Sequence, residues 1–304
     1  MNTKTGSERI VIFLEKSLVL IGGDLRNVKL AEMLAEDEYT IHTFGLENAD
    51  SLRDKKNIKH YNTLHEAIEK SNIIVGPTPL STNNREINML FSSEKIFLDE
   101  FLKEINTGKT LIAGNIKDAY LEQINNNGGK SIDLFKRQEL SVLNAISTAE
   151  GAISIAINET TRTVHGSNVL IMGFGRVGKV LAKMLDGMGA NVYCEARKNV
   201  DLAWAKAYGY NPIHLNNLDA NLDKFDIIIN TIPFMILNAD RLDKVKKGCF
   251  IIDLASNPGG LDRKAAKQKG IKFDWALSLP GRIAPVTSAE FIKETLYNIL
   301  IEIQ

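Results

Sequence analysis

Residues 168–178 read NVLIMGFGRVG, and this stretch decides the fold. It opens with the apolar run of a buried strand and then turns through glycines spaced as G-x-G-x-x-G. Gly173 permits a tight turn, Gly175 lets the backbone approach a phosphate, and Gly178 lets the following helix pack closely on the strand. Apolar side chains then recur at helical spacing up to Met188. A strand, a glycine turn and a helix in this order predict a dinucleotide-binding unit.

The end of the next strand distinguishes the two nicotinamide cofactors. An acidic residue there bonds the ribose 2′-hydroxyl of NAD and repels the 2′-phosphate of NADP. The terminal position is Ala196, followed by Arg197 and Lys198, and a guanidinium group matches phosphate geometry. Strand alternation turns Glu195 to the opposite face unless the register is shifted by one residue. We therefore expect NADP, with NAD as the alternative.

Short β-branched runs alternate with helical patterns on both sides of the glycine turn, which is typical of parallel sheets. The expected strands are residues 18–21, 40–44, 73–75, 110–113, 169–172, 192–195, 227–230, 250–254 and 272–276. The expected helices of the first half are residues 28–36, 64–70 and 99–106.

Residues 140–157 carry apolar side chains at helical spacing with little interruption, which predicts a long helix between the two halves. The sequence thus indicates an α/β protein with two Rossmann-like domains, each with a parallel sheet, joined by a long interdomain helix. We expect residues 1–140 to form a substrate or partner domain and residues 141–288 the NAD(P)-binding Rossmann domain. Residues 289–304 are expected to form a C-terminal helix that packs back on the first domain.

Composition excludes several classes of function. The 37 Lys and Arg residues balance 37 Asp and Glu residues, so no attraction to nucleic acid or membranes is implied. Residues 1–6 lack the apolar core of a signal peptide, and we expect a cytoplasmic protein. The cysteines, Cys194 and Cys249, and the five histidines show no metal spacing, which favours buried thiols and no metal site.

Ligands bind outside the carboxyl ends of the strands in open α/β sheets, so the loops there are the candidate cofactor site. Turn chemistry alone is the competing interpretation of each such residue. The expected cofactor contacts are Gly173, Phe174, Gly175, Arg176, Val177, Gly178, Ala196, Arg197, Asn230, Thr231, Ile232, Pro233, Asp253, Ala255, Ser256 and Pro280.

The first half has a similar turn, Gly22-Gly23-Asp24-Leu25-Arg26, without the glycine spacing of a nucleotide site. A second loop, residues 76–79, follows another expected strand. A substrate domain is the simpler interpretation. Asp24 has the further interpretation of a helix cap.

Longer stretches resemble the family of dipicolinate synthase A subunits. They are residues 144–152 (NAISTAEGA), 173–178, 196–197, 230–233, 253–262 (DLASNPGGLD) and 279–281. The resemblance covers nearly the whole chain. Ser147 stands where proline is frequent in that family, and Asn257 where other polar residues occur, but neither touches the glycine turn.

The resemblance implies a sporulation enzyme of endospore-forming bacteria, acting in the cytoplasm of the mother cell with the flavoprotein-like B subunit of dipicolinate synthase. It implies oxidation of dihydrodipicolinate, which derives from 4-hydroxytetrahydrodipicolinate, to dipicolinate with hydride transfer to NAD(P). The number of copies in the assembly, including a homo-oligomer, stays open.

Removing a hydride and a proton from a dihydropyridine yields an aromatic ring, so positioning should dominate catalysis. The ring carboxylates of such a dicarboxylate substrate need cations or N–H groups. The candidates are Arg26, Ser147, Thr148, Gly281 and Arg282. If the hydroxylated compound is the substrate, a general acid must assist loss of water, and the candidates are His165 and Glu150. Solvated surface groups are the competing interpretation of these charged residues.

Two other functions fit the same sequence. A stand-alone NADP-dependent hydroxy or imino acid dehydrogenase would turn over without any second protein. A non-catalytic dinucleotide-sensing module would bind the cofactor and transfer no hydride.

Overall fold

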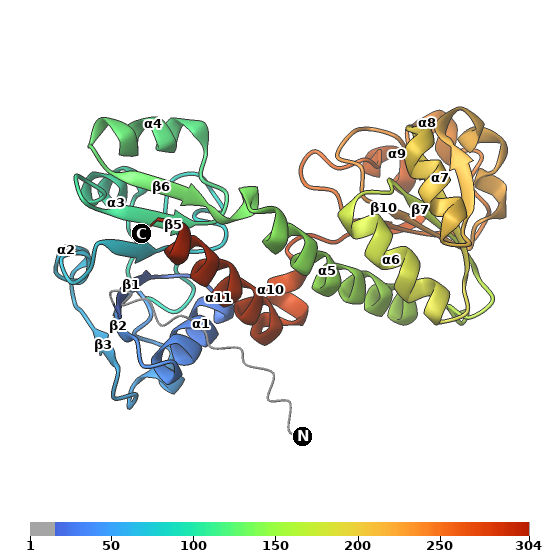
Figure 1. Ribbon diagram of the computed structural model, residues 1–304. Coiled ribbons are helices and arrows are strands. Elements are labelled where there is room, and N and C mark those ends of the chain that lie inside the picture. The colour runs from blue at the N-terminus through green and yellow to red at the C-terminus, as the bar shows by residue number, and fades with distance from the viewer. Residues whose placement is uncertain (1–15, 304) are drawn as a thin grey trace, which may run out of the picture. The chain divides into compact units, whose positions relative to one another are not determined.

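The computed structural model describes residues 16–303 of the chain (Figure 1). The opening residues, on which the expectation of a missing signal peptide depends, lie outside this range. The chain forms two compact units. Unit 1 comprises Met1–Leu140 and Ala289–Gln304, and unit 2 comprises Ser141–Ser288.

The sheet of unit 1 has six parallel strands in the order β3-β2-β1-β4-β5-β6. The strands are β1 (Ser17–Ile21), β2 (Thr40–Phe44), β3 (Ile58–His60), β4 (Ile73–Val75), β5 (Thr110–Ala113) and β6 (Lys130–Asp133). The helices are α1 (Leu25–Glu36), α2 (Leu64–Ile68), α3 (Leu98–Glu104), α4 (Asp118–Asn126) and α11 (Pro285–Glu302), with the 3-10 turns η1 (Asp50–Leu52) and η2 (Leu134–Lys136).

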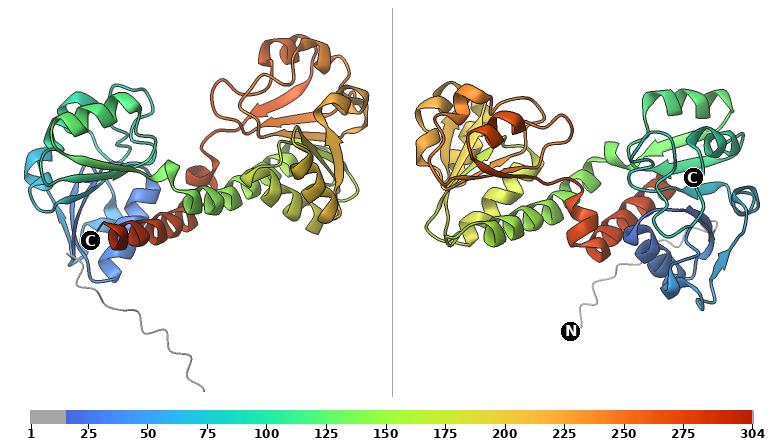
Figure 2. Two further views of the ribbon diagram at one scale, coloured as in Figure 1. Left: turned by 45° about the horizontal axis from the view of Figure 1, so that its top comes forward. Right: turned by 180° about the vertical axis from the view of Figure 1, so that it is seen from behind.

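Alternation along the central strands divides the interior of unit 1 into two cores. Leu18 and Leu20 of β1 face a core shared with α1 and α11, whereas Val19 and Ile21 face a core shared with α2 and α3. Strands buried on both faces are apolar throughout, as expected for a parallel sheet. Figures 1 and 2 show α11 lying alongside α1, although the two helices are far apart in the sequence.

The sheet of unit 2 is also parallel and six-stranded, in the order β9-β8-β7-β10-β11-β12. The strands are β7 (Asn168–Met172), β8 (Asn191–Ala196), β9 (Asn211–His214), β10 (Ile227–Asn230), β11 (Phe250–Asp253) and β12 (Lys272–Trp275). The helices are α5 (Gln138–Glu159), α6 (Arg176–Gly187), α7 (Asn199–Ala207), α8 (Ala239–Leu242), α9 (Arg263–Gln268) and α10 (Leu279–Ile283), with η3 (Leu215–Ala220) and η4 (Leu222–Lys224). This is the strand order typical of dinucleotide-binding folds.

Helix α5 is long and apolar enough to cross a membrane by length and composition alone. Its buried side chains, including Ala149, Ala152 and Ala156, instead pack in the core of unit 2 with β7 and α6. We therefore interpret α5 as a core helix.

Both cysteines, Cys194 and Cys249, are buried free thiols. Burial raises the pKa of each to about 12, so neither is a thiolate near neutral pH. Within residues 16–303, no group of three His, Cys, Asp or Glu side chains is placed to hold a metal ion.

Candidate functional site

The glycine turn lies between β7 and α6, and each of its glycines meets a separate steric demand. Gly173 has a φ of +89°, and a Cβ there would stand 2.6 Å from Thr231 Oγ1. A Cβ at Gly178 would stand 2.1 Å from the carbonyl oxygen of Gly173, so the helix packs as closely on the turn as the spacing predicts. A Cβ at Gly175 would meet nothing within 4 Å. The turn is therefore rigid on its inner side and open on its outer side.

The amino end of α6 faces this open side. Its N-cap residue is Gly175, and no side chain caps the helix. The first N–H groups and the positive end of the helix dipole are thus available to an anion, as in dinucleotide sites. A cavity of about 480 Å³ adjoins the turn. Its lining includes the turn residues 173–175, the end of β8 (residues 195–198) and the loop after β10 (residues 231–236). These features fit a nicotinamide dinucleotide.

Phe174 supports the turn from below. Its ring is buried and packs against the rings of Tyr208 and Tyr210, with Lys179 Nζ 5.8 Å from the ring centroid. These contacts join the turn to the end of α7 and the start of β9. The side chain therefore fixes the turn that a phosphate would approach.

The end of β8 presents both signs of charge. Arg197 and Lys198 are exposed at the rim of the cavity, whereas Ala196 is buried in the core under α6. Glu195 lies on the opposite face of the strand from Ala196, as alternation predicts, and yet it lines the same cavity. It is 1% exposed, and its Oε2 has no hydrogen-bond partner among the described residues.

Burial raises the pKa of Glu195 to about 7. The Gly173 N–H and the guanidinium groups of Arg241 and Arg197 act in the opposite direction. Glu195 is therefore partly neutral near pH 7. Glu195 lies on the face that alternation predicts, and it still lines the cavity because the cavity extends over the end of the sheet and reaches both faces.

Two buried polar residues organise the loops around the cavity. Asp253 Oδ2 accepts hydrogen bonds from the N–H groups of Gly260 (2.8 Å) and Leu261 (3.1 Å), and its Oδ1 accepts from Ala255 N–H (3.1 Å) and Asn230 Nδ2 (2.8 Å). Asn230 also bonds both the N–H and the carbonyl of Ile232. These polar atoms face the loops, so both residues position the loops around the cavity, and their contact with the cofactor stays a prediction.

The remaining predicted loop residues lie at the same edge of the sheet. Thr231 donates to the carbonyl of Met172 (2.9 Å), and Ile232 and Pro233 line the cavity. Ala255 is buried and accepts a hydrogen bond from Trp275 Nε1, whereas Ser256 is exposed.

Apolar residues that the sequence analysis did not select extend the loop after β10. Phe234 is 74% exposed and Met235 is also exposed, and both line the cavity. The sequence signal for them is two large apolar residues directly after the predicted cofactor loop, residues 230–233.

Two stretches that carry the family resemblance meet in unit 2. A Cβ at Gly151 would stand 3.1 Å from Leu279, so α10 packs directly on α5. One turn earlier, Ser147 is buried and its Oγ has no partner within the described chain, whereas Thr148 Oγ1 donates to the Asn144 carbonyl.

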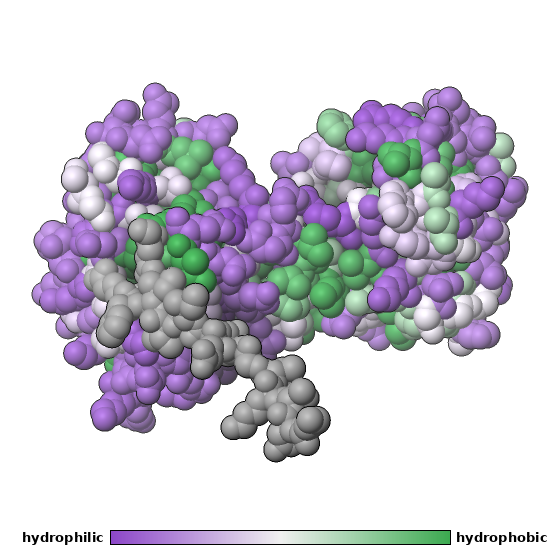
Figure 3. Space-filling model, in the orientation of Figure 1, coloured by the Kyte–Doolittle hydropathy of each residue, from purple (hydrophilic) through white to green (hydrophobic). Residues whose placement is uncertain are grey.

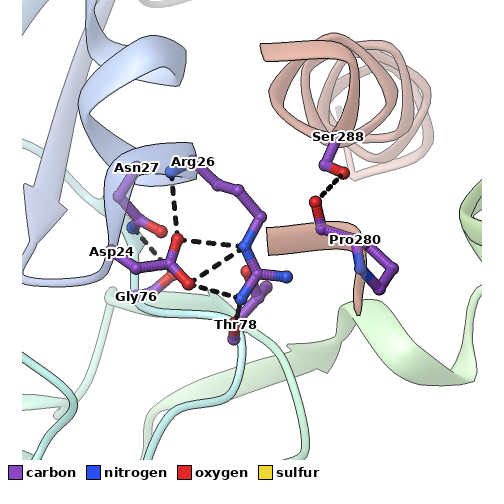
Figure 4. A network of polar contacts seen from close by, with 7 residues as sticks. All are labelled: Asp24, Arg26, Asn27, Gly76, Thr78, Pro280 and Ser288. Atoms are coloured by element: carbon purple, nitrogen blue, oxygen red, sulfur yellow. Dashed lines mark hydrogen bonds and ion pairs between the residues drawn. The ribbon is translucent and has the colours of Figure 1, made fainter. Parts of the chain in front are cut away.

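A hydrogen bond also fixes the start of α10. Pro280 accepts a hydrogen bond from Ser288 Oγ at 3.0 Å (Figure 4). Gly281 is half-buried, and Arg282 is exposed.

The two predicted general acids are not brought to the cofactor cavity. His165 precedes β7, and its ring packs against Gly189 at the amino end of the sheet. The five residues of β7 place this end about 15 Å from the turn. Glu150 is exposed and lines a groove between α5 and α6 with apolar residues that include Ile157 and Met188. Figure 3 shows hydrophobic residues gathered over α5.

The corresponding turn of unit 1 is closed. Gly23 N–H donates to the Asn88 carbonyl (2.7 Å), and Leu90 N–H donates to the Gly23 carbonyl (3.0 Å). A Cβ at Gly22 would stand 2.5 Å from Met89 Cγ. The segment 88–90 thus packs directly on this turn, where unit 2 has an open side.

Arg26 belongs to a buried network in unit 1 rather than to the surface. Asp24 caps α1 by accepting from the Arg26 N–H (3.0 Å), and its carboxylate also binds the guanidinium through Nε and Nη2 (2.7 Å). Nη2 donates further to the Thr78 carbonyl (Figure 4). Arg26 is 6% exposed, so the interpretation as a solvated arginine is wrong.

Two family models match the chain. Residues 17–135 match the N-terminal domain of the dipicolinate synthase A subunit, and residues 146–261 match the NAD-binding domain of D-isomer specific 2-hydroxyacid dehydrogenases. Together with the glycine turn and its cavity, these matches define an NAD(P)-dependent oxidoreductase with two Rossmann-like domains.

Proteins named as dipicolinate synthase A subunits are similar to this chain over nearly their full length. The A subunit of dipicolinate synthase from Bacillus subtilis is 34% identical, over 94% of this chain and 96% of the relative. The crystal structure of the same Bacillus subtilis protein superposes with a TM-score of 0.87 at 34% identity, covering 96% of this chain and 98% of that chain. The corresponding protein from Bacillus halodurans gives a TM-score of 0.87 at 30% identity, covering 95% and 99%. The chain belongs to the family of dipicolinate synthase A subunits.

Proposed function

We propose that this chain is the dehydrogenase subunit of dipicolinate synthase and oxidises dihydrodipicolinate to dipicolinate with hydride transfer to NADP. The main support is the relative named as the A subunit of dipicolinate synthase, which aligns over 96% of its own length. The open glycine turn of unit 2 supplies the matching cofactor site.

NADP is favoured over NAD by the charges at the end of β8. Arg197 and Lys198 are exposed at the cavity rim, where a 2′-phosphate would meet them. Glu195 and Asp201 are acids that line this cavity, and the raised pKa of Glu195 reduces its repulsion of a phosphate near neutral pH. When bound, the nicotinamide supplies the hydride acceptor.

In the proposed reaction the dihydropyridine loses a hydride and a proton and becomes an aromatic pyridine. The main contribution of the chain to catalysis is then to bind and orient the substrate, and proton transfer contributes less. Exposed Arg282, the start of α10 around Gly281 and the hydroxyls of Ser147 and Thr148 are the groups of unit 2 that we assign to substrate orientation.

The proposal gives no role to His165, because it lies at the amino end of the sheet, or to Glu150, whose groove is separate from the cofactor cavity. Dihydrodipicolinate therefore forms by loss of water from 4-hydroxytetrahydrodipicolinate before the hydride step, without these residues.

The names of the relatives, which identify them as one subunit of a synthase, support a partner. We propose that this partner is a flavoprotein-like B subunit, and that the two proteins act in the mother-cell cytoplasm of a sporulating bacterium.

The experiment mixes the purified chain with enzymatically generated substrate, with and without the partner, and with NADP or NAD. We expect reduced cofactor and pyridine absorbance to appear together, with NADP preferred. Turnover at the full rate without the partner would indicate a stand-alone dehydrogenase. Absence of both products from the complete mixture would refute the hydride-transfer proposal.

A further inference from the structure

The topological switch point of unit 1 carries polar groups that the fold leaves unused. Strands β1 and β4 are neighbours in the sheet, and the chain leaves them toward opposite sides. Crevices outside the carboxyl ends of such a strand pair are where α/β sheets bind ligands. Here the two loops are residues 22–26 and 76–79, and segment 88–90 packs on the first of them.

Arg26 is held with one edge of its guanidinium group occupied and one nitrogen unused. Nε and Nη2 bind the Asp24 carboxylate, and Nη2 also binds the Thr78 carbonyl. Within residues 16–303, Nη1 has no hydrogen-bond partner, and in Figure 4 it points away from Asp24. A clamped guanidinium that keeps two free N–H donors is preorganised for an anion.

Thr78 supplies a second unused donor beside it. The residue is 3% exposed, and its Oγ1 has no partner in the described part of the chain. Its methyl group faces Gly114, where an added Cβ would stand 2.8 Å from Thr78 Cγ2. Figure 4 shows Thr78 lying against the guanidinium of Arg26. A buried hydroxyl without a partner is costly unless a ligand completes it.

We propose that Arg26 Nη1 and Thr78 Oγ1 form a carboxylate-binding site of unit 1, which holds one carboxylate of the dicarboxylate substrate, with Asp24 as a positioning residue. This inference rests on the proposed function for the identity of the substrate. The two oxygens of a carboxylate can accept one hydrogen bond each from a guanidinium N–H and a hydroxyl. The closed turn disfavours the longer phosphate chain of a nucleotide. From the sequence, Arg26 is a candidate ligand of a ring carboxylate. The proposed site explains why this arginine is buried and held by Asp24.

The test is calorimetric titration of the full-length chain with pyridine-2,6-dicarboxylate. Wild type is expected to bind it, and unsubstituted pyridine is expected not to bind. Thr78→Val keeps the shape of the side chain and removes the hydroxyl, and it should weaken binding ~10-fold or more, because a hydrogen bond to a charged group is lost. Thr78→Ser should restore binding. Thr110→Val, at the other end of the same sheet, is the matched control and should change nothing.

Replacing Arg26 alone would leave the half-buried Asp24 without its partner, so the pair is exchanged together as Asp24→Asn with Arg26→Gln. This double variant should lose dicarboxylate binding while its NADP affinity, which depends on unit 2, stays at the wild-type level. That unchanged affinity, with an unchanged circular dichroism spectrum, shows that the variants are folded.

Wild-type chain that does not bind the dicarboxylate would overturn the site, and so would a folded Thr78→Val variant that binds as tightly as wild type. Failure of the proposed function looks different. In that case dicarboxylate binding would depend on Thr78, but the complete reaction mixture would form no reduced cofactor.

Discussion

Replacement of Glu195 by glutamine should make the chain more stable at alkaline pH and leave it nearly unchanged at acid pH. The wild-type carboxyl has an ordinary pKa of 4.5 and a folded-state pKa of about 7, because folding buries it. Between these values the folded state holds a proton that the unfolded state has released, so the free energy of unfolding falls as pH rises. Above the folded pKa the full penalty applies, which amounts to about 3 kcal/mol. Glutamine has nearly the same shape and no charge to desolvate.

Both tryptophans of the chain, Trp204 and Trp275, lie in unit 2 with Glu195. Their fluorescence during urea unfolding of the cofactor-free chain therefore reports the correct unit. The stability gain of Glu195→Gln should grow from near zero at about pH 4, below the unfolded pKa, to about 3 kcal/mol at about pH 9. Glu122→Gln, which exchanges an exposed carboxyl of α4, serves as control and should show no such trend. Parallel pH curves for Glu195→Gln and wild type would refute the reasoning, as would a variant that is less stable at about pH 9.

Three further changes test the cofactor site. Gly178→Ala places a methyl group against the Gly173 carbonyl, so it should lower the unfolding free energy of unit 2 by ~1–3 kcal/mol and abolish tight NADP binding. A calorimetric NADP affinity equal to that of wild type would contradict the steric account. Arg197→Ala should weaken NADP binding ~10–100-fold and leave NAD binding within about twofold, whereas an equal loss for both would show that this arginine does not contact the 2′-phosphate. Asp253→Ala leaves three buried N–H groups without acceptors and should speed hydrogen exchange across residues 254–261, and unchanged protection there would exclude its role as the loop anchor.

The central strands of each sheet and the edge strand β12 were predictable from sequence, whereas the other edge strands were not. Apolar strands such as β7 and β10 are buried on both faces, so their pattern is continuous and their ends are sharply marked. The edge strands β3, β6 and β9 were missed, because runs such as Ile58–His60 and Asn211–His214 are short and largely polar. Helix α4 was missed as well, since only Ile124 among its residues is buried.

The glycine turn was predictable in detail because its demands are local and steric. The contacts of Arg26 with Thr78 and of Asp253 with Asn230 were not, because the folded sheet alone brings these groups together. Glu195 illustrates the same limit. Alternation gave its face correctly, but only the three-dimensional cavity shows that a residue on that face still lines the site.

Segment 88–90 has a consequence for stoichiometry. Both units share one strand order, but Met89 fills the turn of unit 1 while nothing stands over Gly175 in unit 2. A protein built from two halves of the same architecture should therefore take up a single equivalent of nicotinamide dinucleotide per chain. The shared strand order of the two units therefore does not predict two cofactor sites.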